Sequence, residues 1–281
     1  MQTSFKQGLG GIVLSASLIA GTVLFGLRAI YSPAVQATLA AMMLVATCLS
    51  AWWLGASAIT TASDERRRLA IAASLLITPI ALFALLAGMG PPGEGQTAAE
   101  EEFRFLVLLV SAIVIAAGWI VLKEALSEAG ERLLSPLGFA AAVLAAPLYI
   151  VFTGVQAVDC LQMQRAGSIK QPPGFPPLDE LSVVLLFFGG VLSYLATAAF
   201  AASLARMRWL SRPAASVFIG LSLLAAMFLL KRGLSYPDLS KGFAHWYTIP
   251  SFVVGIPAVP WMMPCALGIA LLRRAGRPSE G

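Results

Sequence analysis

The chain has 281 residues, of which 58% are hydrophobic and only 12% are charged, and its formal net charge is +5. Soluble globular proteins carry about 25% charged residues, so this composition excludes that class and indicates that lipid is the solvent. The mean hydropathy of +0.83 supports the same conclusion. We attribute the positive charge to topology in a membrane rather than to a surface for nucleic acid.

Eight stretches approach the length of about 20 apolar residues that a transmembrane helix needs. They lie near residues 9–30, 34–60, 69–89, 104–122, 137–157, 181–205, 213–230 and 248–272. None alternates in polarity as the strands of a membrane barrel do, so helices are expected. The sequence therefore predicts an all-α fold, a polytopic integral membrane helical bundle. It forms a single transmembrane domain over residues 1–281, with no soluble domain.

The first stretch resembles a secretory signal because Lys6 precedes an apolar run. That run, from Gly8 to Ile30, exceeds the core of about 7–15 residues in a signal peptide, so we predict a retained span. With eight spans, twelve of the 19 Lys and Arg residues fall on one side of the membrane and seven on the other. This asymmetry predicts that both termini are cytoplasmic (N-in/C-in) in a cell membrane of the bacterial inner-membrane type.

The first long loop on the predicted outer side is rich in glutamate. We expect its carboxylates to form a solvated acidic rim before the span that begins near residue 104. The four glutamates are Glu94, Glu100, Glu101 and Glu102. A second outer loop contains the sequence PPGFPP, which favours extended polyproline geometry. Such a loop would either brace a partner or lie across the bundle.

The third outer loop, residues 231–250, predicts a short amphipathic helix at the membrane surface. Asp238 and His245 fall on one face of that helix, two turns apart, while Leu239 and Trp246 fall on the other. Two interpretations stay open. The polar face is either a pair that handles protons or orients a ligand, or a solvated surface above a lipid-buried one.

The sequence offers little chemistry inside the membrane. Of its fourteen acidic residues, only Asp159 approaches a span interior, and its position about 22 residues into the fifth span puts it at the outer interface. His245 is the single histidine, so one chain cannot supply the two imidazoles of a b-type haem or a histidine-ligated metal site. We therefore predict no catalytic residues, no metal site and no cofactor.

The last predicted span contains interior prolines at positions 257, 260 and 264. Each removes the donor for the carbonyl four residues earlier. The carbonyls released in this way are those of Val253, Ile256 and Pro260. They lie on one helix face at positions i, i+3 and i+7. Broken helices often mark binding sites in transporters, so these carbonyls either bind a ligand or are satisfied by neighbouring helices.

Two predicted spans carry small residues at every fourth position, a pattern that lets helix backbones approach closely in lipid. They are Gly138, Ala142 and Ala146 in one span and Gly189, Ser193, Thr197 and Ala201 in the next. With no catalytic cluster, these stripes favour a non-catalytic membrane subunit that packs with or anchors partner proteins, or copies of itself, in a larger inner-membrane complex.

Two alternatives stay open. The first is a transporter or facilitator for a neutral or cationic small molecule, in which the carbonyls of Val253, Ile256 and Pro260 line the site and the surface helix acts as an outer gate. The second is a lipid-modifying membrane enzyme that uses Asp238 and His245. Neither alternative, nor the subunit, requires nucleic acid.

Overall fold

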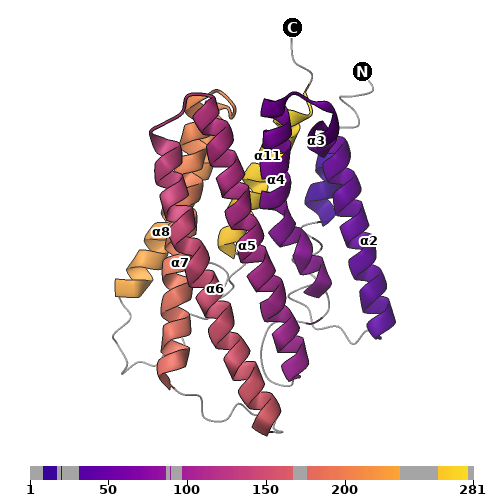
Figure 1. Cartoon of the computed structure of the whole chain (residues 1–281), viewed down its shortest axis with the longest axis vertical. Coiled ribbons are helices and arrows are strands. Elements are labelled where there is room, and N and C mark those ends of the chain that lie inside the picture. The colour runs from indigo at the N-terminus through magenta and orange to yellow at the C-terminus, as the bar shows by residue number, and fades with distance from the viewer. Residues whose placement is uncertain are drawn as a thin grey trace. The chain divides into compact units, whose positions relative to one another are not determined.

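The computed structural model describes residues 9–17, 20, 32–86, 89, 97–166, 176–234 and 259–277, and this part of the chain is almost entirely helical with no strand (Figure 1). Residues 9–17 and 20 are helical. The named elements are α2 (Pro33–Ala51), the π-helical turn η1 (Trp52–Ala56), α3 (Ala58–Thr61), α4 (Asp64–Leu82), the 3₁₀ turn η2 (Phe83–Leu86), α5 (Ala98–Glu128), α6 (Leu134–Ala166), α7 (Pro176–Arg206), α8 (Arg212–Leu234) and α11 (Val259–Ala275).

Six of the predicted spans are confirmed as helices long and apolar enough to cross a membrane. They are Ala34–Ala56, Asp64–Leu86, Ala98–Glu128, Leu134–Gln162, Val184–Arg206 and Arg212–Leu230. The all-α membrane class is thereby confirmed. The first span is described only at residues 9–17 and 20, and the last only from Val259 onward, so the total of eight spans and the N-in/C-in topology stay predictions.

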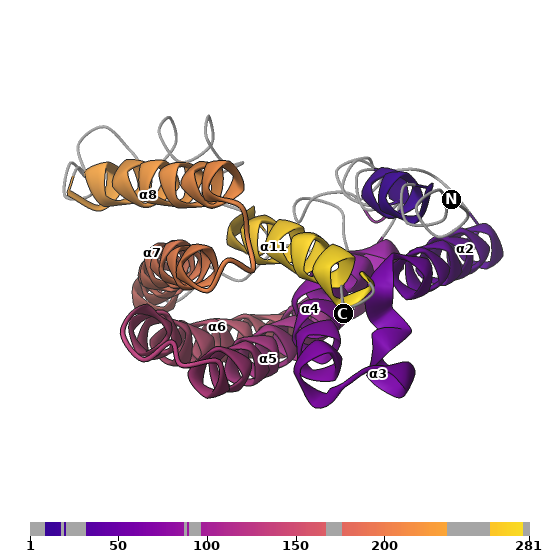
Figure 2. The same cartoon turned by 90° about the horizontal axis from the view of Figure 1, so that it is seen from above.

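The chain divides into two compact units: Met1–Ala125 together with Cys265–Gly281, and Leu126–Pro264. In the first unit, α4 lies between the other helices (Figure 2). Its Leu69 and Leu76 are fully buried. A Cβ added at Gly118 of α5 would lie 3.0 Å from the Leu76 side chain, and one at Gly268 of α11 would lie 2.8 Å from the Ala73 carbonyl oxygen. Glycine therefore permits close helix crossings on two sides of α4.

The second predicted span, near 34–60, is not one continuous helix. It widens into the π-turn η1 and ends in the separate short helix α3. The physical reason is close packing at Gly55, where an added Cβ would overlap the Leu272 carbonyl oxygen and lie 2.9 Å from the Gly276 nitrogen. Because only glycine leaves room for this approach, the turn holds the end of α2 against the last turn of α11.

In the second unit, α6 and α7 pack along the predicted stripes of small residues. A Cβ at Gly138 would lie 2.9 Å from the Phe200 ring, and one at Gly189 would lie 3.2 Å from the Tyr149 ring. Thr197 and Ala201 are fully buried. This part of the packing prediction is confirmed. The α7–α8 contact is an apolar cluster of Val191, Tyr194, Ala226 and Leu229.

The predicted acidic rim is partly wrong. Helix α5 begins at Ala98, before the expected residue 104, because Thr97 and Glu100 form a capping box. The Thr97 amide donates to the Glu100 carboxylate at 2.8 Å, and the Glu100 amide donates to the Thr97 hydroxyl at 3.3 Å. The side chain of Glu101, the residue after this box, is buried, and its carboxylate lies 3.5 Å from the guanidinium of Arg104. Glu102 is exposed, as expected, and Glu94 lies outside the described residues.

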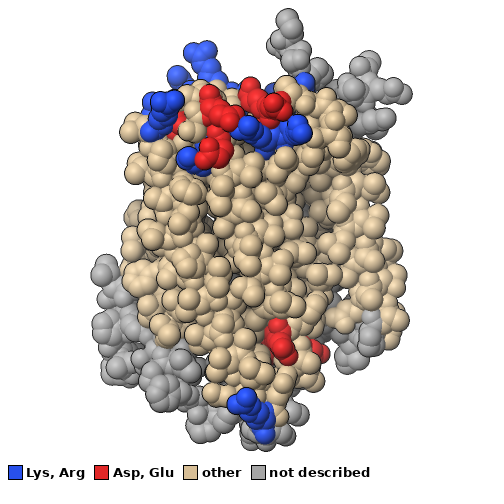
Figure 3. Space-filling view, viewed as in Figure 1, with Lys and Arg blue, Asp and Glu red and all other residues tan. Residues whose placement is uncertain are grey.

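Charged side chains gather at the helix ends, with uncharged surface between them (Figure 3). At one such end, the Glu131 carboxylate is buried and accepts three backbone N–H groups, from Leu133 at 3.1 Å, Leu134 at 3.0 Å and Ser135 at 2.6 Å. Arg206 lies 3.8 Å away. Burial by itself would raise the pKa of Glu131, but the hydrogen bonds to the carboxylate prevail and lower it to about 2. Glu131 therefore stabilises the start of α6 as an anion.

Candidate functional site

Of the five predicted ligand-binding residues, the structure describes only Pro260. Val253, Ile256, Asp238 and His245 lie outside the described residues. Pro260 is the second residue of α11, a position where a helix does not need the missing N–H. Pro264 lies inside α11 and has no N–H to donate to the Pro260 carbonyl. Of the three carbonyls that the sequence predicts to be released by a proline, the described part of the chain therefore contains this one.

Pro260 packs against α7 at a glycine. A Cβ added at Gly190 would lie 3.7 Å from the Pro260 ring and 3.1 Å from the Leu229 side chain of α8. Pro260 itself is buried. The first turn of α11 is therefore held against α7 and α8 inside the second unit, and the absence of a side chain at Gly190 lets the proline ring approach.

The next residue, Trp261, makes the most specific contact of this turn. Its ring lies edge-on to that of Tyr149 in α6, with centroids 5.1 Å apart and an interplanar angle of 61°. Both side chains are buried, at 1% and 2% exposure. Gly189 leaves room for the Tyr149 ring, and the Ser193 hydroxyl donates to the Tyr149 oxygen at 3.5 Å. The aromatic pair thus joins three helices, because α7 supplies both the gap and the donor.

A second polar contact joins α6 and α7. The Gln156 amide donates to the Ser182 hydroxyl at 3.0 Å. Gln156 is seven residues after Tyr149, so the two side chains lie on one face of α6. Sequence reasoning missed these residues. The signal was present in the spacing of a tyrosine and a glutamine in an otherwise apolar span, where polar side chains usually face another helix.

The chemistry of this site is that of neutral donors and acceptors. Tyr149, Gln156, Ser182 and Ser193 supply hydroxyl and amide groups, and Trp261 supplies an indole N–H. Among the described residues, no group of three or more His, Cys, Asp or Glu side chains is close enough to hold a metal ion. The arrangement can hydrogen-bond a neutral group or fix helices in place, and it contains no side chain suited to acid–base chemistry near neutral pH.

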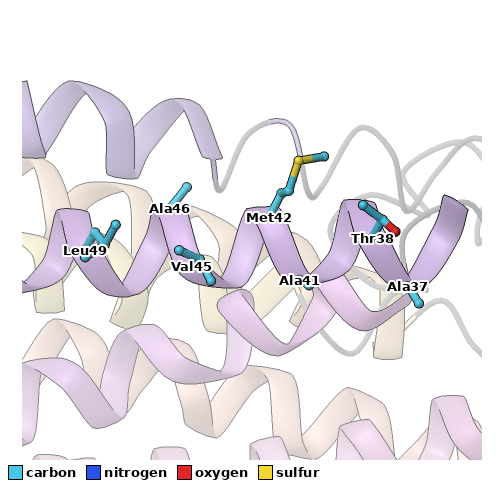
Figure 4. A pocket seen from close by; sticks show the side chains of 7 residues that line it. All are labelled: Ala37, Thr38, Ala41, Met42, Val45, Ala46 and Leu49. Carbon is cyan, nitrogen blue, oxygen red and sulfur yellow. The ribbon is translucent and has the colours of Figure 1, made fainter. Parts of the chain in front are cut away.

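A different feature lies on α2. It is a hollow, a shallow and open depression lined by residues of α2 alone: Ala37, Thr38, Ala41, Met42, Val45, Ala46 and Leu49 (Figure 4). The Thr38 hydroxyl donates back to the Ala34 carbonyl at 2.8 Å, so its single donor is used within the helix. The lining is otherwise apolar, which suits another apolar surface and not a polar solute.

Six long apolar helices define the chain as a multi-pass membrane protein. No family model, curated protein or solved structure matches it. What the chain does must therefore be argued from the aromatic contact of Tyr149 with Trp261 and from the hollow on α2.

Proposed function

We propose that the chain is a non-catalytic subunit of a larger membrane complex and that α2 packs against a partner helix. The proposal rests on the hollow of α2. Only 17% of the apolar window of this helix is buried within the chain, compared with 61% for α4. Small side chains at Ala37 and Ala41, four residues apart, lie in the hollow, with Met42 and Val45 beside them.

This surface differs from one built only to face lipid. In a bilayer, helices associate by close packing, which small residues at fourfold spacing permit. Helix α8 offers a comparison, because only 22% of its window is buried. Its exposed side chains are large: Val217, Leu221, Leu224, Met227 and Phe228. Helix α2 also exposes large side chains, among them Met42, Val45 and Leu49, but it places the small Ala37 and Ala41 one turn apart between them, which would let a second helix approach closely.

Cross-linking from Cys48 tests the proposal. Cys48 lies on α2 and is exposed, while Cys160 and Cys265 are buried, so a thiol-directed photo-cross-linker should label Cys48 selectively in native membranes. We expect one adduct of defined mass. Twice the 29.5 kDa of the chain would indicate self-association, and another mass would indicate a different partner. Ala41→Leu fills the hollow and should abolish the adduct.

A matched control places the thiol on α8. In a Cys48→Ala background, Gly220→Cys introduces a cysteine at an exposed position of α8 where an added Cβ would meet nothing within 4 Å. We expect lipid adducts alone from that site. Protein adducts of equal yield from both helices, or an adduct from Cys48 that survives Ala41→Leu, would contradict a specific partner surface on α2.

The second candidate is a facilitator for a neutral or cationic small molecule. It is supported by the Pro260 carbonyl, which lacks a helical donor and lies one residue before the buried Trp261. Pro264→Ala restores an N–H for that carbonyl, so a facilitator should lose solute flux in liposomes while a subunit should keep its cross-link.

The proposed location is a bacterial-type inner membrane with both termini cytoplasmic, which the 12-to-7 division of basic residues favours.

A further inference from the structure

Arginines gather at one end of the first unit, where α4 begins and α11 ends. The sequence places three at the start of α4 and three around the end of α11: Arg66, Arg67, Arg68, Arg273, Arg274 and Arg277. The Arg66 guanidinium donates to the Arg277 carbonyl at 3.0 Å and so joins the two segments. The Arg273 guanidinium lies over Gly11, 2.5 Å from the position that a Cβ would take. The arginines of α4 and α11 therefore meet at this end of the unit, and Arg273 also covers Gly11 of the first helical segment.

Carboxylates at this end neutralise only part of the charge. Asp64 pairs with Arg67 at 3.2 Å, and Glu124 pairs with Lys123 at 2.8 Å. At this end of the first unit, the described residues are six arginines and Lys123 against Asp64, Glu65 and Glu124, a net charge of 7 − 3 = +4. Arg66 donates to a neutral carbonyl, so that contact fixes its position without cancelling its charge. Such a surface is complementary to an anion.

Two tryptophans place this end at the depth of lipid headgroups. Trp52 and Trp53 are exposed at 47% and 46%. They lie in η1, whose Gly55 packs against the last turn of α11 just before Arg273. Exposed tryptophan in a membrane protein concentrates at the boundary between acyl chains and headgroups. The guanidinium groups beside η1 therefore lie where lipid phosphates lie.

We propose that Arg66, Arg273 and Arg277 bind the phosphate of an anionic phospholipid. Arginine presents a planar fork that matches phosphate oxygens, which favours a phosphodiester over a diffuse cloud of counterions. The acyl chains of that lipid would run past the exposed rings of Trp52 and Trp53. This inference stands on the arginine geometry and does not depend on a partner for α2.

The test uses the full chain in detergent, titrated with phosphatidylglycerol or phosphatidylcholine and followed by native mass spectrometry. We expect the first phosphatidylglycerol to bind at least tenfold more tightly than phosphatidylcholine. Basic side chains at a membrane surface each contribute a factor of about five, so replacing Arg66, Arg273 and Arg277 by glutamine should weaken binding about 100-fold. The triple lysine variant keeps the charge but not the fork and should lose about tenfold. If the glutamine variant does not fold, the lysine variant decides.

A control variant removes the same kind of charge elsewhere. Arg132→Gln with Arg212→Gln removes two exposed arginines of the second unit on the same predicted side. We expect less than a twofold change in the affinity for phosphatidylglycerol. Equal losses in both sets of variants would overturn the proposal, because the arginines would then act only as topological charge. Displacement of the lipid by inorganic phosphate at low millimolar concentration would also overturn it, because the ligand would then be the free anion.

Discussion

The buried ring of Trp261 lies edge-on to that of Tyr149, at a centroid distance of 5.1 Å. This contact holds the first turn of α11 against α6, and it follows directly after Pro260. The Tyr149 ring is in turn fixed by its contact with Trp261 and by the space that Gly189 of α7 leaves for it. The relationship makes the start of α11 a fixed part of the second unit.

Loss of the aromatic contact should destabilise the fold. Trp261→Ala removes a fully buried ring, and we expect the free energy of unfolding to fall by about 3–5 kcal/mol. Tyr149→Phe keeps the ring and removes only a long hydrogen bond to Ser193, so we expect a loss below about 1 kcal/mol. Thermal unfolding in detergent, followed by circular dichroism, measures both. Equal losses in the two variants would show that the hydroxyl, and not the ring, stabilises this contact.

Glu131 should make stability depend on pH in acid. Its folded-state pKa of about 2 lies below the ordinary value of 4.5, so the anion stabilises the folded state above pH 4.5. This stability should disappear as the pH falls from about 4.5 to about 2, by an amount of about 3 kcal/mol. Glu131→Gln should be less stable at pH 7 and should show a flatter dependence in that window. A variant that keeps the slope of the unmodified chain would assign it to another carboxylate.

Arg206 should contribute little to the Glu131 anchor. Its guanidinium lies 3.8 Å from the carboxylate and is about half exposed, whereas the three backbone donors are closer. Arg206→Ala should therefore cost less than about 1 kcal/mol at neutral pH. A loss as large as that of Glu131→Gln would mean that the ion pair, and not the helix N-terminus, holds the anion.

The turn between α7 and α8 stores backbone strain at Arg208. This residue has φ of 57°, in the left-handed region, and the amides of Trp209 and Leu210 both donate to the Leu204 carbonyl. Such helix ends prefer glycine. Arg208→Gly should be more stable than Arg208→Ala by about 1 kcal/mol, since both variants lose the side chain and only alanine keeps the strain. Equal unfolding temperatures for the two would refute the strain.

Alanine substitutions at two glycines should change the stability of the fold in opposite directions. At Gly268, an added Cβ would lie 2.8 Å from the Ala73 carbonyl oxygen, so Gly268→Ala should force α11 from α4 and cost about 1–3 kcal/mol. At Gly154 in α6, nothing lies within 4 Å, and Gly154→Ala should stabilise the helix by up to about 1 kcal/mol. Unfolding temperatures measure the pair. Stabilisation at both positions would mean that the crossing at Gly268 is loose.

The fold class and six spans followed from the sequence because apolar length is the main signal of a membrane helix. The α6–α7 contact also followed, since the spacing of Gly138 and Gly189 with their neighbours predicts close packing. The break at Gly55 did not, because it depends on α11, more than 200 residues later. The burial of Glu101 was missed because the capping box moves the start of α5 from residue 104 to Ala98, which puts Glu101 inside the helix and on its buried face instead of in a solvated loop.

The candidate site was only partly accessible to sequence reasoning. Proline positions singled out Pro260 and Pro264, because lost hydrogen bonds can be counted from sequence alone, but the predicted span of 248–272 made Pro260 an interior residue, whereas it is the second residue of α11. The partner of Trp261 could not be predicted, since Tyr149 is brought to it by the packing of α6 on α7. The hollow on α2 was missed for a related reason: it requires knowing which face of a uniformly apolar helix is left uncovered by the part of the chain that the structure describes.

The mass of the particle extracted gently from its native membrane tests the central claim most directly. A non-catalytic subunit predicts a stable complex heavier than the 29.5 kDa chain, and Ala37→Leu with Ala41→Leu should reduce it to the single chain without unfolding it. Gly220→Leu on α8 should leave the complex intact. A particle of one chain, together with solute flux in liposomes that is lost in Pro264→Ala, would contradict the subunit and favour the facilitator.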